Sequence, residues 1–249
     1  MNTVNYVKDS DIYQELIKDA DKYLPEVEQP LNKIKLSVQL DEFQYYIHNV
    51  GYWLFQYDKQ ISELSYSIKF LRNFDYNKFN NDSKPNRVDH LDYTISNYYI
   101  RLSSILDKSL QIINAIFHLG ISEYGVKEST IKTNSFVKKT DVLKPYKKMK
   151  KVVSNGKNIR NSIIHRDFYT DKNLHKLRYF YSLDKNLVVF KDKYLNEYRR
   201  DRLNEYLNDI EQEFNEQFEN LISVISTFLD KLHLIYIKKK KEFKARGLV

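Results

Sequence analysis

The residues best suited to chemistry stand together in one stretch, residues 158–169, which reads Asn-Ile-Arg-Asn-Ser-Ile-Ile-His-Arg-Asp-Phe-Tyr. It places a guanidinium (Arg160), an amide (Asn161) and an imidazole (His165) beside apolar residues. A histidine with a pKa of about 6.5 can take a proton from a 2′-hydroxyl or give one to a leaving oxygen. A guanidinium can meet two phosphate oxygens in a fork and stabilise charge that builds in the transition state. These groups suit the cleavage of a phosphodiester bond in RNA, which needs no metal because RNA carries its own nucleophile.

The spacing of the three residues limits how they can act together. Asn161 and His165 are four apart and would share a face of a helix, so that the amide could hydrogen-bond the imidazole. Arg160 and His165 are five apart, which separates them by about 140° on a straight helix. A shared site therefore needs a helix break near His165, the reach of the arginine, or a second copy of the chain. On spacing alone, which often arises by chance, the simpler interpretation is a surface ion pair and a histidine at a helix end.

Positive charge is concentrated around this stretch. The chain has a formal charge of +8, from 41 Lys and Arg against 33 Asp and Glu. Residues 127–166 hold twelve basic and two acidic side chains, a net charge of +10, so the rest of the chain carries −2. Such a segment would draw phosphates, although a solvated lysine-rich face accounts for it equally well. The expected RNA contacts are Lys147, Lys148, Lys150, Lys151, Lys157 and Arg166.

Several other chemistries find no support in the sequence. Cysteine is absent, which excludes disulfides, thiolate metal sites and cysteine nucleophiles. The five glycines form no phosphate-cradling loop, and no cofactor is expected. The run Asp89-His90-Leu91-Asp92 puts a histidine among acids, but no second histidine stands at ligand spacing, so no metal is expected.

The sequence also favours a cytoplasmic protein that does not contact a membrane. Residues 1–20 contain acids and no apolar core of a secretory signal. The most apolar late run, residues 221–237, contains Asp230, Lys231 and His233 and is too polar for a spanning helix.

Long amphipathic segments must hold the stretch in place. Apolar residues recur at helical spacing over residues 40–71, 91–119 and 203–235, and a short first helix is expected between Asp9 and Pro25. Another helix begins near Pro145 and continues through the motif with Gly156 inside it, at a cost of about 1 kcal/mol relative to alanine. Loops are expected at residues 73–86 and 122–140, and a frayed basic tail at residues 238–249.

Two segments favour strands instead. Residues 30–41 alternate between apolar and polar side chains, and residues 179–183 and 187–190 flank an Asp-Lys-Asn turn in the manner of a β-hairpin. The predicted fold is mainly α: an up-and-down bundle of long helices with a small β-hairpin or short antiparallel sheet. No linker or internal repeat interrupts the chain, so a single domain over residues 1–249 is predicted.

The run from Arg160 to His165 resembles the Arg-x(4–6)-His motif of the HEPN superfamily, including the polar residue after the arginine. The long apolar helices are also similar to those of stand-alone bacterial HEPN proteins, over about residues 40–237, with an N-terminal extension at residues 1–39 and a basic tail at residues 238–249. The resemblance implies a helical bundle that forms a homodimer in which two motifs face each other across a cleft. It implies a metal-independent endoribonuclease in which Arg160 and His165 are catalytic and Asn161 positions them.

The resemblance also suggests a biological role, since many such proteins are toxins of toxin–antitoxin systems or anti-phage effectors, and an antitoxin protein is a further partner it allows. HEPN toxins paired with minimal nucleotidyltransferases usually have a tyrosine two residues after the histidine, where this chain has Asp167. Two alternatives stay open. One is a non-catalytic HEPN-like module that binds RNA or a partner protein, and the other is a purely structural helical dimer.

Overall fold

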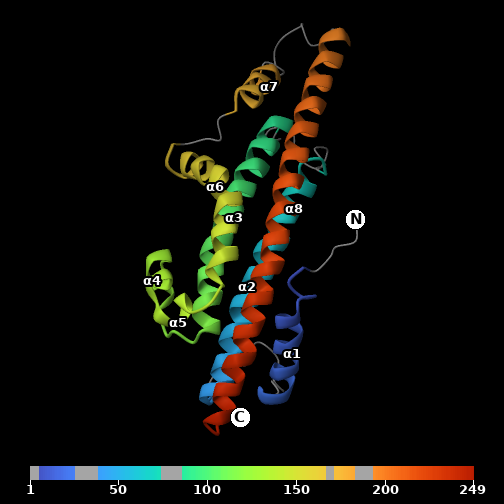
Figure 1. Ribbon diagram of the computed structural model, residues 1–249. Helices are drawn as coiled ribbons and strands as arrows, with labels where there is room; N and C mark the ends of the chain where they lie inside the picture. The colour runs from blue at the N-terminus through green and yellow to red at the C-terminus, as the bar shows by residue number, and fades with distance from the viewer. Residues whose placement is uncertain (1–5, 26–38, 74–85, 167–170, 183–192) are drawn as a thin grey trace. The chain divides into compact units, whose positions relative to one another are not determined.

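The computed structural model describes residues 6–25, 39–73, 86–166, 171–182 and 193–249 (Figure 1). These residues form α-helices and one short 3-10 helix, and no strand occurs among them. The prediction of a mainly α fold is therefore confirmed. The helices are α1 (Asp11–Tyr23), α2 (Glu42–Phe70), α3 (Arg87–Ile116), η4 (Glu123–Gly125), α4 (Glu128–Thr133), α5 (Ser135–Lys138), α6 (Leu143–Arg166), α7 (Lys172–Ser182) and α8 (Lys193–Ala245).

The starts of the two long early helices are set by side chains that bond to free backbone amides. Before α2, the backbone N–H of Gln44 donates to Asp41 Oδ1 (2.8 Å) and that of Asp41 donates to Gln44 Oε1 (3.1 Å), so the two residues form a capping box. Before α3, Asn86 Oδ1 accepts from the backbone N–H groups of Val88 (2.8 Å) and Asp89 (3.0 Å). These bonds satisfy amides that have no partner within the first turn of a helix.

The prediction of a β-hairpin is wrong. Residues 179–182 belong to α7, and residues 187–190 lie outside the described part of the chain. Leu174 and Leu177, three residues apart, are both buried, so helical burial outweighs the strand preference of the Tyr-Phe-Tyr run. The predicted strand within residues 30–41 falls mostly on residues 26–38, which are not described, and residues 39–41 are not in a strand.

The expected loop at residues 122–140 is also wrong in part, because it contains η4, α4 and α5. Ile131 and Val137 are fully buried. The side chain of Asn134 caps α5 by accepting from the backbone N–H groups of Phe136 and Val137. Two buried apolar side chains and a cap therefore suffice to order short helices where the lysine content suggested a loop.

The chain divides into two compact units, each with its own core. Unit 1 comprises residues 1–60, 105–150 and 222–249, and unit 2 comprises residues 61–104 and 151–221. In unit 1 the ring of Tyr46 stacks on that of Tyr236 with centroids 5.8 Å apart. In unit 2 the ring of Tyr98 stacks on that of Phe214 at 3.6 Å. The single domain expected over residues 1–249 stays a prediction.

The end of α8 is helical through Ala245, so the prediction of a frayed tail there is wrong.

Within the described residues, α8 is the one helix long and apolar enough to cross a membrane by length and composition. A single such helix is a weak indicator, because the core helix of a soluble protein meets the same criterion. In unit 1 its side chains Phe228, Leu229 and Leu232 are buried in the protein core.

Candidate functional site

Helix α6 carries the whole run from Arg160 to His165 without interruption. Pro145 lies in its first turn, as predicted, and its 24 residues include eight Lys and Arg and no Asp or Glu. The helix break that would bring the positions of Arg160 and His165 onto one face does not occur before Arg166. Of the three ways to form a shared site, the reach of the arginine and a second copy of the chain remain.

Close packing in unit 2 fixes the middle of α6. A Cβ atom added at Gly156 would lie 2.8 Å from Leu102 Cδ2 and 3.1 Å from Tyr99 Cδ1, both on α3. A glycine lets the two helices approach without displacing Leu102 or Tyr99, which accounts for its presence here. From α8, Gln217 Nε2 donates to the backbone oxygen of Val152 (3.2 Å). The helix that bears the motif is thus held on two sides.

The guanidinium of Arg160 lies partly inside this packed region. Its side chain is half-buried, and Nη1 donates to Asn161 Oδ1 at 3.3 Å. Its Nε atom is buried and has no hydrogen-bond partner among the described residues. A buried N–H without an acceptor is unfavourable, so the position of this Nε atom costs the fold some stability. The side chain of His165 lies outside the described residues, so its predicted bond to Asn161 stays a prediction.

The lysines predicted to contact RNA fall into different environments. Lys147, Lys148 and Lys151 are exposed on α6. Lys150 is half-buried and forms an ion pair with Glu128 (2.8 Å). The side chains of Lys157 and Arg166 are not among those described.

The charge of Lys150 is offset at the partly exposed surface of unit 1 by its ion pair with Glu128. Burial pushes the pKa of Glu128 upward, but hydrogen bonds from Lys132 and Lys150 outweigh it and hold that pKa below its ordinary value. Glu128 is therefore charged at neutral pH and compensates Lys150. The sequence alone could not separate Lys150 from its neighbours, because its partner is 22 residues away.

The acid–histidine run at the start of α3 has a structural role in unit 2. His90 is buried, and burial lowers the pKa of its imidazole. Asp92 forms an ion pair with Arg178 of α7 (2.8 Å), although burial raises the pKa of its carboxyl group. No group of three or more His, Asp or Glu side chains in the described ranges is arranged to hold a metal ion.

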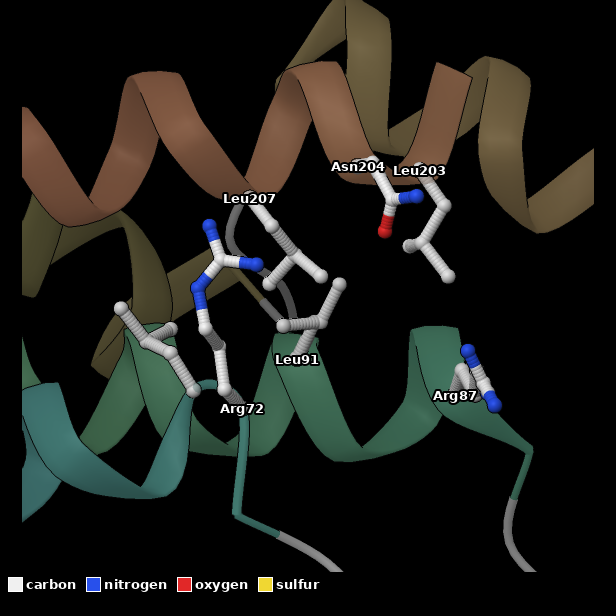
Figure 2. A pocket seen from close by; sticks show the side chains of 7 residues that line it. Arg72, Arg87, Leu91, Leu203, Asn204 and Leu207 are labelled. Carbon is white, nitrogen blue, oxygen red and sulfur yellow. The ribbon is translucent and has the colours of Figure 1, made fainter. Parts of the chain in front are cut away.

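Unit 2 also contains a hollow of about 200 Å³, shown in Figure 2, that the sequence did not indicate. The side chains of Leu91 from α3 and Leu207 from α8 point toward each other across it. Arg72 lines the hollow, but its guanidinium donates to Glu211 Oε2 (2.5 Å) and Asn208 Oδ1 (2.5 Å). The positive charge of Arg72 is therefore already compensated inside the protein.

Comparison with known proteins places this helical chain in a family. No match to it was found among curated proteins or among solved structures. A family model described as HEPN_Cthe2314-like HEPN matches residues 34–233, which include the Arg160–His165 run and most of the long helices. The resemblance inferred from that run is thus confirmed over most of the chain. The protein belongs to the HEPN_Cthe2314-like HEPN family.

Proposed function

We propose that this protein is a metal-independent endoribonuclease of the HEPN type, which cuts RNA by 2′-hydroxyl attack at a site built from two copies of the chain. The observation that carries the proposal is that Arg160 and His165 both lie on α6, inside the region that matches the HEPN family. The hydrogen bond from Arg160 Nη1 to Asn161 Oδ1, which joins two of the three motif residues, supports it. A role as a toxin or anti-phage effector is part of the same proposal.

The reaction assigns one task to each residue. The 2′-oxygen forms a bond to phosphorus as the bond from phosphorus to the 5′-oxygen breaks, and the products are a 2′,3′-cyclic phosphate and a 5′-hydroxyl. His165 takes the proton from the 2′-hydroxyl or delivers one to the leaving 5′-oxygen. Arg160 stabilises the added charge on the phosphate oxygens. Asn161 positions the guanidinium through its bond to Nη1.

The unbroken course of α6 through the motif favours a composite site. Positions five apart on a straight helix diverge by about 140°, so one chain does not present Arg160 and His165 side by side unless the arginine reaches around the helix. HEPN domains commonly dimerise and bind RNA. Two α6 helices that face each other would supply both groups to one phosphate.

RNA would be drawn to α6 by its uncompensated charge. Lys147, Lys148 and Lys151 are exposed, and together with Lys157 and Arg166 they would contact phosphates along the strand. Lys150 contributes least, because Glu128 already neutralises it.

The deciding experiment is cleavage of single-stranded RNA by the purified protein in the presence of EDTA. Arg160→Ala and His165→Ala should each reduce the cleavage rate by roughly 10²-fold or more, as expected for loss of a transition-state contact or of general acid–base catalysis. A substrate with 2′-O-methyl groups should resist cleavage altogether, because its nucleophile is blocked.

Matched controls separate catalysis from folding. His175→Ala on α7 and Arg200→Ala on α8 remove exposed side chains of the same types and should leave the rate unchanged. Arg160→Lys keeps the charge but loses the fork and should recover little activity. If both alanine variants at Arg160 and His165 retain full cleavage, the site assignment is wrong. Salt-sensitive RNA binding without any product would instead indicate the non-catalytic module.

The two-copy site makes a separate prediction about assembly. Light scattering at micromolar concentration should give the mass of a dimer, about twice the 30.0 kDa chain. A monomer that still cuts RNA would contradict the composite site while leaving the roles of the two residues intact.

A further inference from the structure

Helix α1 lies outside the region that matches the HEPN family. That region begins at residue 34, whereas α1 covers Asp11–Tyr23. The match ends at residue 233, so Tyr236 and Lys240 of α8, which bond to α1, lie outside it as well. All of these residues belong to unit 1. The chain therefore adds to the family region both a helix and some of the residues that hold it.

Helix α2 forms one side of the seat on which α1 lies. Leu16 of α1 packs over Gly51, where an added Cβ would lie 3.6 Å from Leu16 Cδ2. Gln44 Nε2 donates to the backbone oxygen of Tyr23 (2.9 Å), at the end of α1. The last carbonyls of a helix have no partner within the helix. Helix α2 thus offers α1 a small residue beneath its apolar face and a donor for its C-terminal end.

The end of α8 forms the other side of the seat and supplies its positive charge. Lys240 Nζ donates to Glu15 Oε1 (2.7 Å) and to Asp19 Oδ1 (2.6 Å). The hydroxyl of Tyr236 donates to Asp19 Oδ2 (2.8 Å). Glu15 and Asp19 are four residues apart, so their carboxylates share one face of α1. The seat therefore recognises a helix that carries two carboxylates one turn apart.

Apart from these bonds, little holds α1 in place. Of its thirteen residues only Ile12, Leu16 and Asp19 are buried, so the helix buries two apolar side chains. Ser10, at its N-cap, makes no side-chain capping bond. A helix this short is marginal in isolation, and elements with few buried apolar contacts open at a lower free energy than the core. Helix α1 is therefore expected to open locally and to be helical only while docked.

The most favoured second occupant of the seat is a different protein. An α1 from a second copy would make only contacts that the chain's own α1 already makes, at the added cost of association. The chain's own α1 is tethered through residues 24–41, which gives it a high effective concentration at the seat. A helix from another protein can displace it by making contacts that α1 lacks.

We propose that α1 is a detachable occupant of a helix-binding face formed by α2 and the end of α8. It leaves this face by local opening while the rest of unit 1 stays folded. The open face then accepts an amphipathic helix of a partner protein with two carboxylates one turn apart. That helix places an apolar side chain over Gly51 and its carboxylates on Lys240 and Tyr236.

Hydrogen exchange of the full-length protein tests the opening. In the wild type, the backbone amides of α1 should exchange at least about tenfold faster than those at the centre of α2. Leu16→Asp removes the contact with Gly51 and should speed the exchange of α1 further without changing that of α2. Ile17→Asp is the matched control, since Ile17 is the next residue and is 42% exposed. It should change the exchange of α1 by less than about twofold.

A synthetic peptide of residues 6–25, labelled with a fluorophore, tests the open face. It should bind the full-length Leu16→Asp variant in a saturable way, because the residues of the seat on α2 and α8 are unaltered. Binding to the wild type should be at least about tenfold weaker, since the tethered α1 competes. A peptide with Glu15→Gln and Asp19→Asn should bind the variant at least about tenfold more weakly, from the loss of both charge-assisted bonds.

Several results would overturn the proposal. In the wild type, α1 amides that exchange as slowly as those of α2 would make α1 an integral part of the core. A Leu16→Asp variant that unfolds as a whole would do the same. Absence of saturable peptide binding to a folded variant, or equal binding of the neutral peptide, would contradict the helix-binding face.

The oligomeric state distinguishes the remaining occupant. A wild-type dimer that Leu16→Asp abolishes and Ile17→Asp preserves would assign the face to a second copy and overturn its assignment to a partner protein. RNA cleavage is not a readout in any of these experiments, so the failure of this proposal and the failure of the proposed nuclease can be told apart.

Discussion

The end of α8 and the helix α6 are both lysine-rich, yet their charges meet different surroundings. At the end of α8, Lys240 donates to Glu15 (2.7 Å) and to the buried Asp19 (2.6 Å). Tyr236 adds a hydrogen bond to Asp19 (2.8 Å), and Arg246 pairs with Glu42 (2.8 Å). Part of this basic segment is therefore built into the core of unit 1.

Helix α6 is compensated much less. Lys144 pairs with Asp141 and Lys150 with Glu128, but the helix has no acid of its own, and Lys147, Lys148 and Lys151 are exposed. The difference teaches that a basic run in a sequence indicates a binding surface only when carboxylates from elsewhere in the fold do not reach it. By that criterion α6 is left for an anionic partner more than the end of α8, where Lys238, Lys241 and Lys244 are exposed but Lys239, Lys240 and Arg246 are paired with carboxylates.

The largest effect is expected from breaking the pair at the end of α8. Lys240→Met leaves the carboxylate of Asp19 buried without its cation, which should lower the free energy of unfolding by about 3 kcal/mol. Lys147→Met removes an exposed lysine from α6 and should change it by less than about 0.5 kcal/mol. Urea denaturation measures the free energy of unfolding of both variants. Equal losses would mean that the lysines at the end of α8 and on α6 do not differ in their surroundings.

A second test compares the two regions as RNA contacts. Replacing Lys147, Lys148 and Lys151 with glutamine should reduce the slope of log affinity against log salt by about 2, since each lost phosphate contact accounts for about 0.7 on single strands. The same change at the exposed Lys238, Lys241 and Lys244 should leave the slope nearly unaltered. A similar loss in both variants would indicate diffuse attraction without a defined α6 surface.

Close packing, which holds α6 against α3, can be tested at two helical glycines. Gly156→Ala forces a Cβ to within 2.8 Å of the buried Leu102, and the overpacking should outweigh the gain in helix propensity and destabilise the protein by about 1 kcal/mol. At Gly51 in α2 the nearest atom, Leu16 Cδ2, is 3.6 Å from the added Cβ. Gly51→Ala should therefore stabilise the protein by up to about 1 kcal/mol. Thermal unfolding of both variants gives the sign of the change in stability. Stabilisation by Gly156→Ala would show that the side chains of α3 move aside at little cost.

The pH dependence of stability tests the same ion pair at the end of α8. The hydrogen bond from Lys240 holds the pKa of Glu15 below its ordinary value, so this contribution to stability is present above the unfolded pKa of Glu15 and is lost as pH falls through its folded value. Burial lowers the pKa of Lys240, but its bonds to Asp19 and Glu15 outweigh this and raise it. That contribution is present below the unfolded pKa of Lys240 and is lost as pH rises through its folded value.

The difference in urea midpoint between the wild type and Lys240→Met should therefore be largest near neutral pH and should shrink as pH falls through the lowered folded pKa of Glu15. A difference that stays constant between about pH 7 and pH 3 would mean that the carboxylates do not act through Lys240.

Local features were predictable from the sequence because they depend on residues that lie close together in the chain. The capping box of Asp41 and Gln44, the helical spacing of the long segments and the left-handed φ of +68° at Gly120 all arise within a few residues of chain. The short run from Arg160 to His165 also sufficed to indicate the family.

Contacts between distant segments decided the rest. The Tyr-Phe-Tyr run of α7 has strand propensity, and only the burial of Leu174 and Leu177 shows that it is helical. The partner of Gln111 was equally hidden, because its Nε2 donates to the backbone oxygen of Glu123, 12 residues further along the chain.

What the sequence by itself determined is the helical class, the family and the basic character of α6. Only the tertiary structure decided which charges are available, since Lys240 is separated from Glu15 by 225 residues and no local pattern encodes that pairing. Helix caps and hydrophobic periodicity act over one or two turns of helix, whereas ion pairs, buried hydrogen bonds and close packing depend on which distant side chains folding brings together.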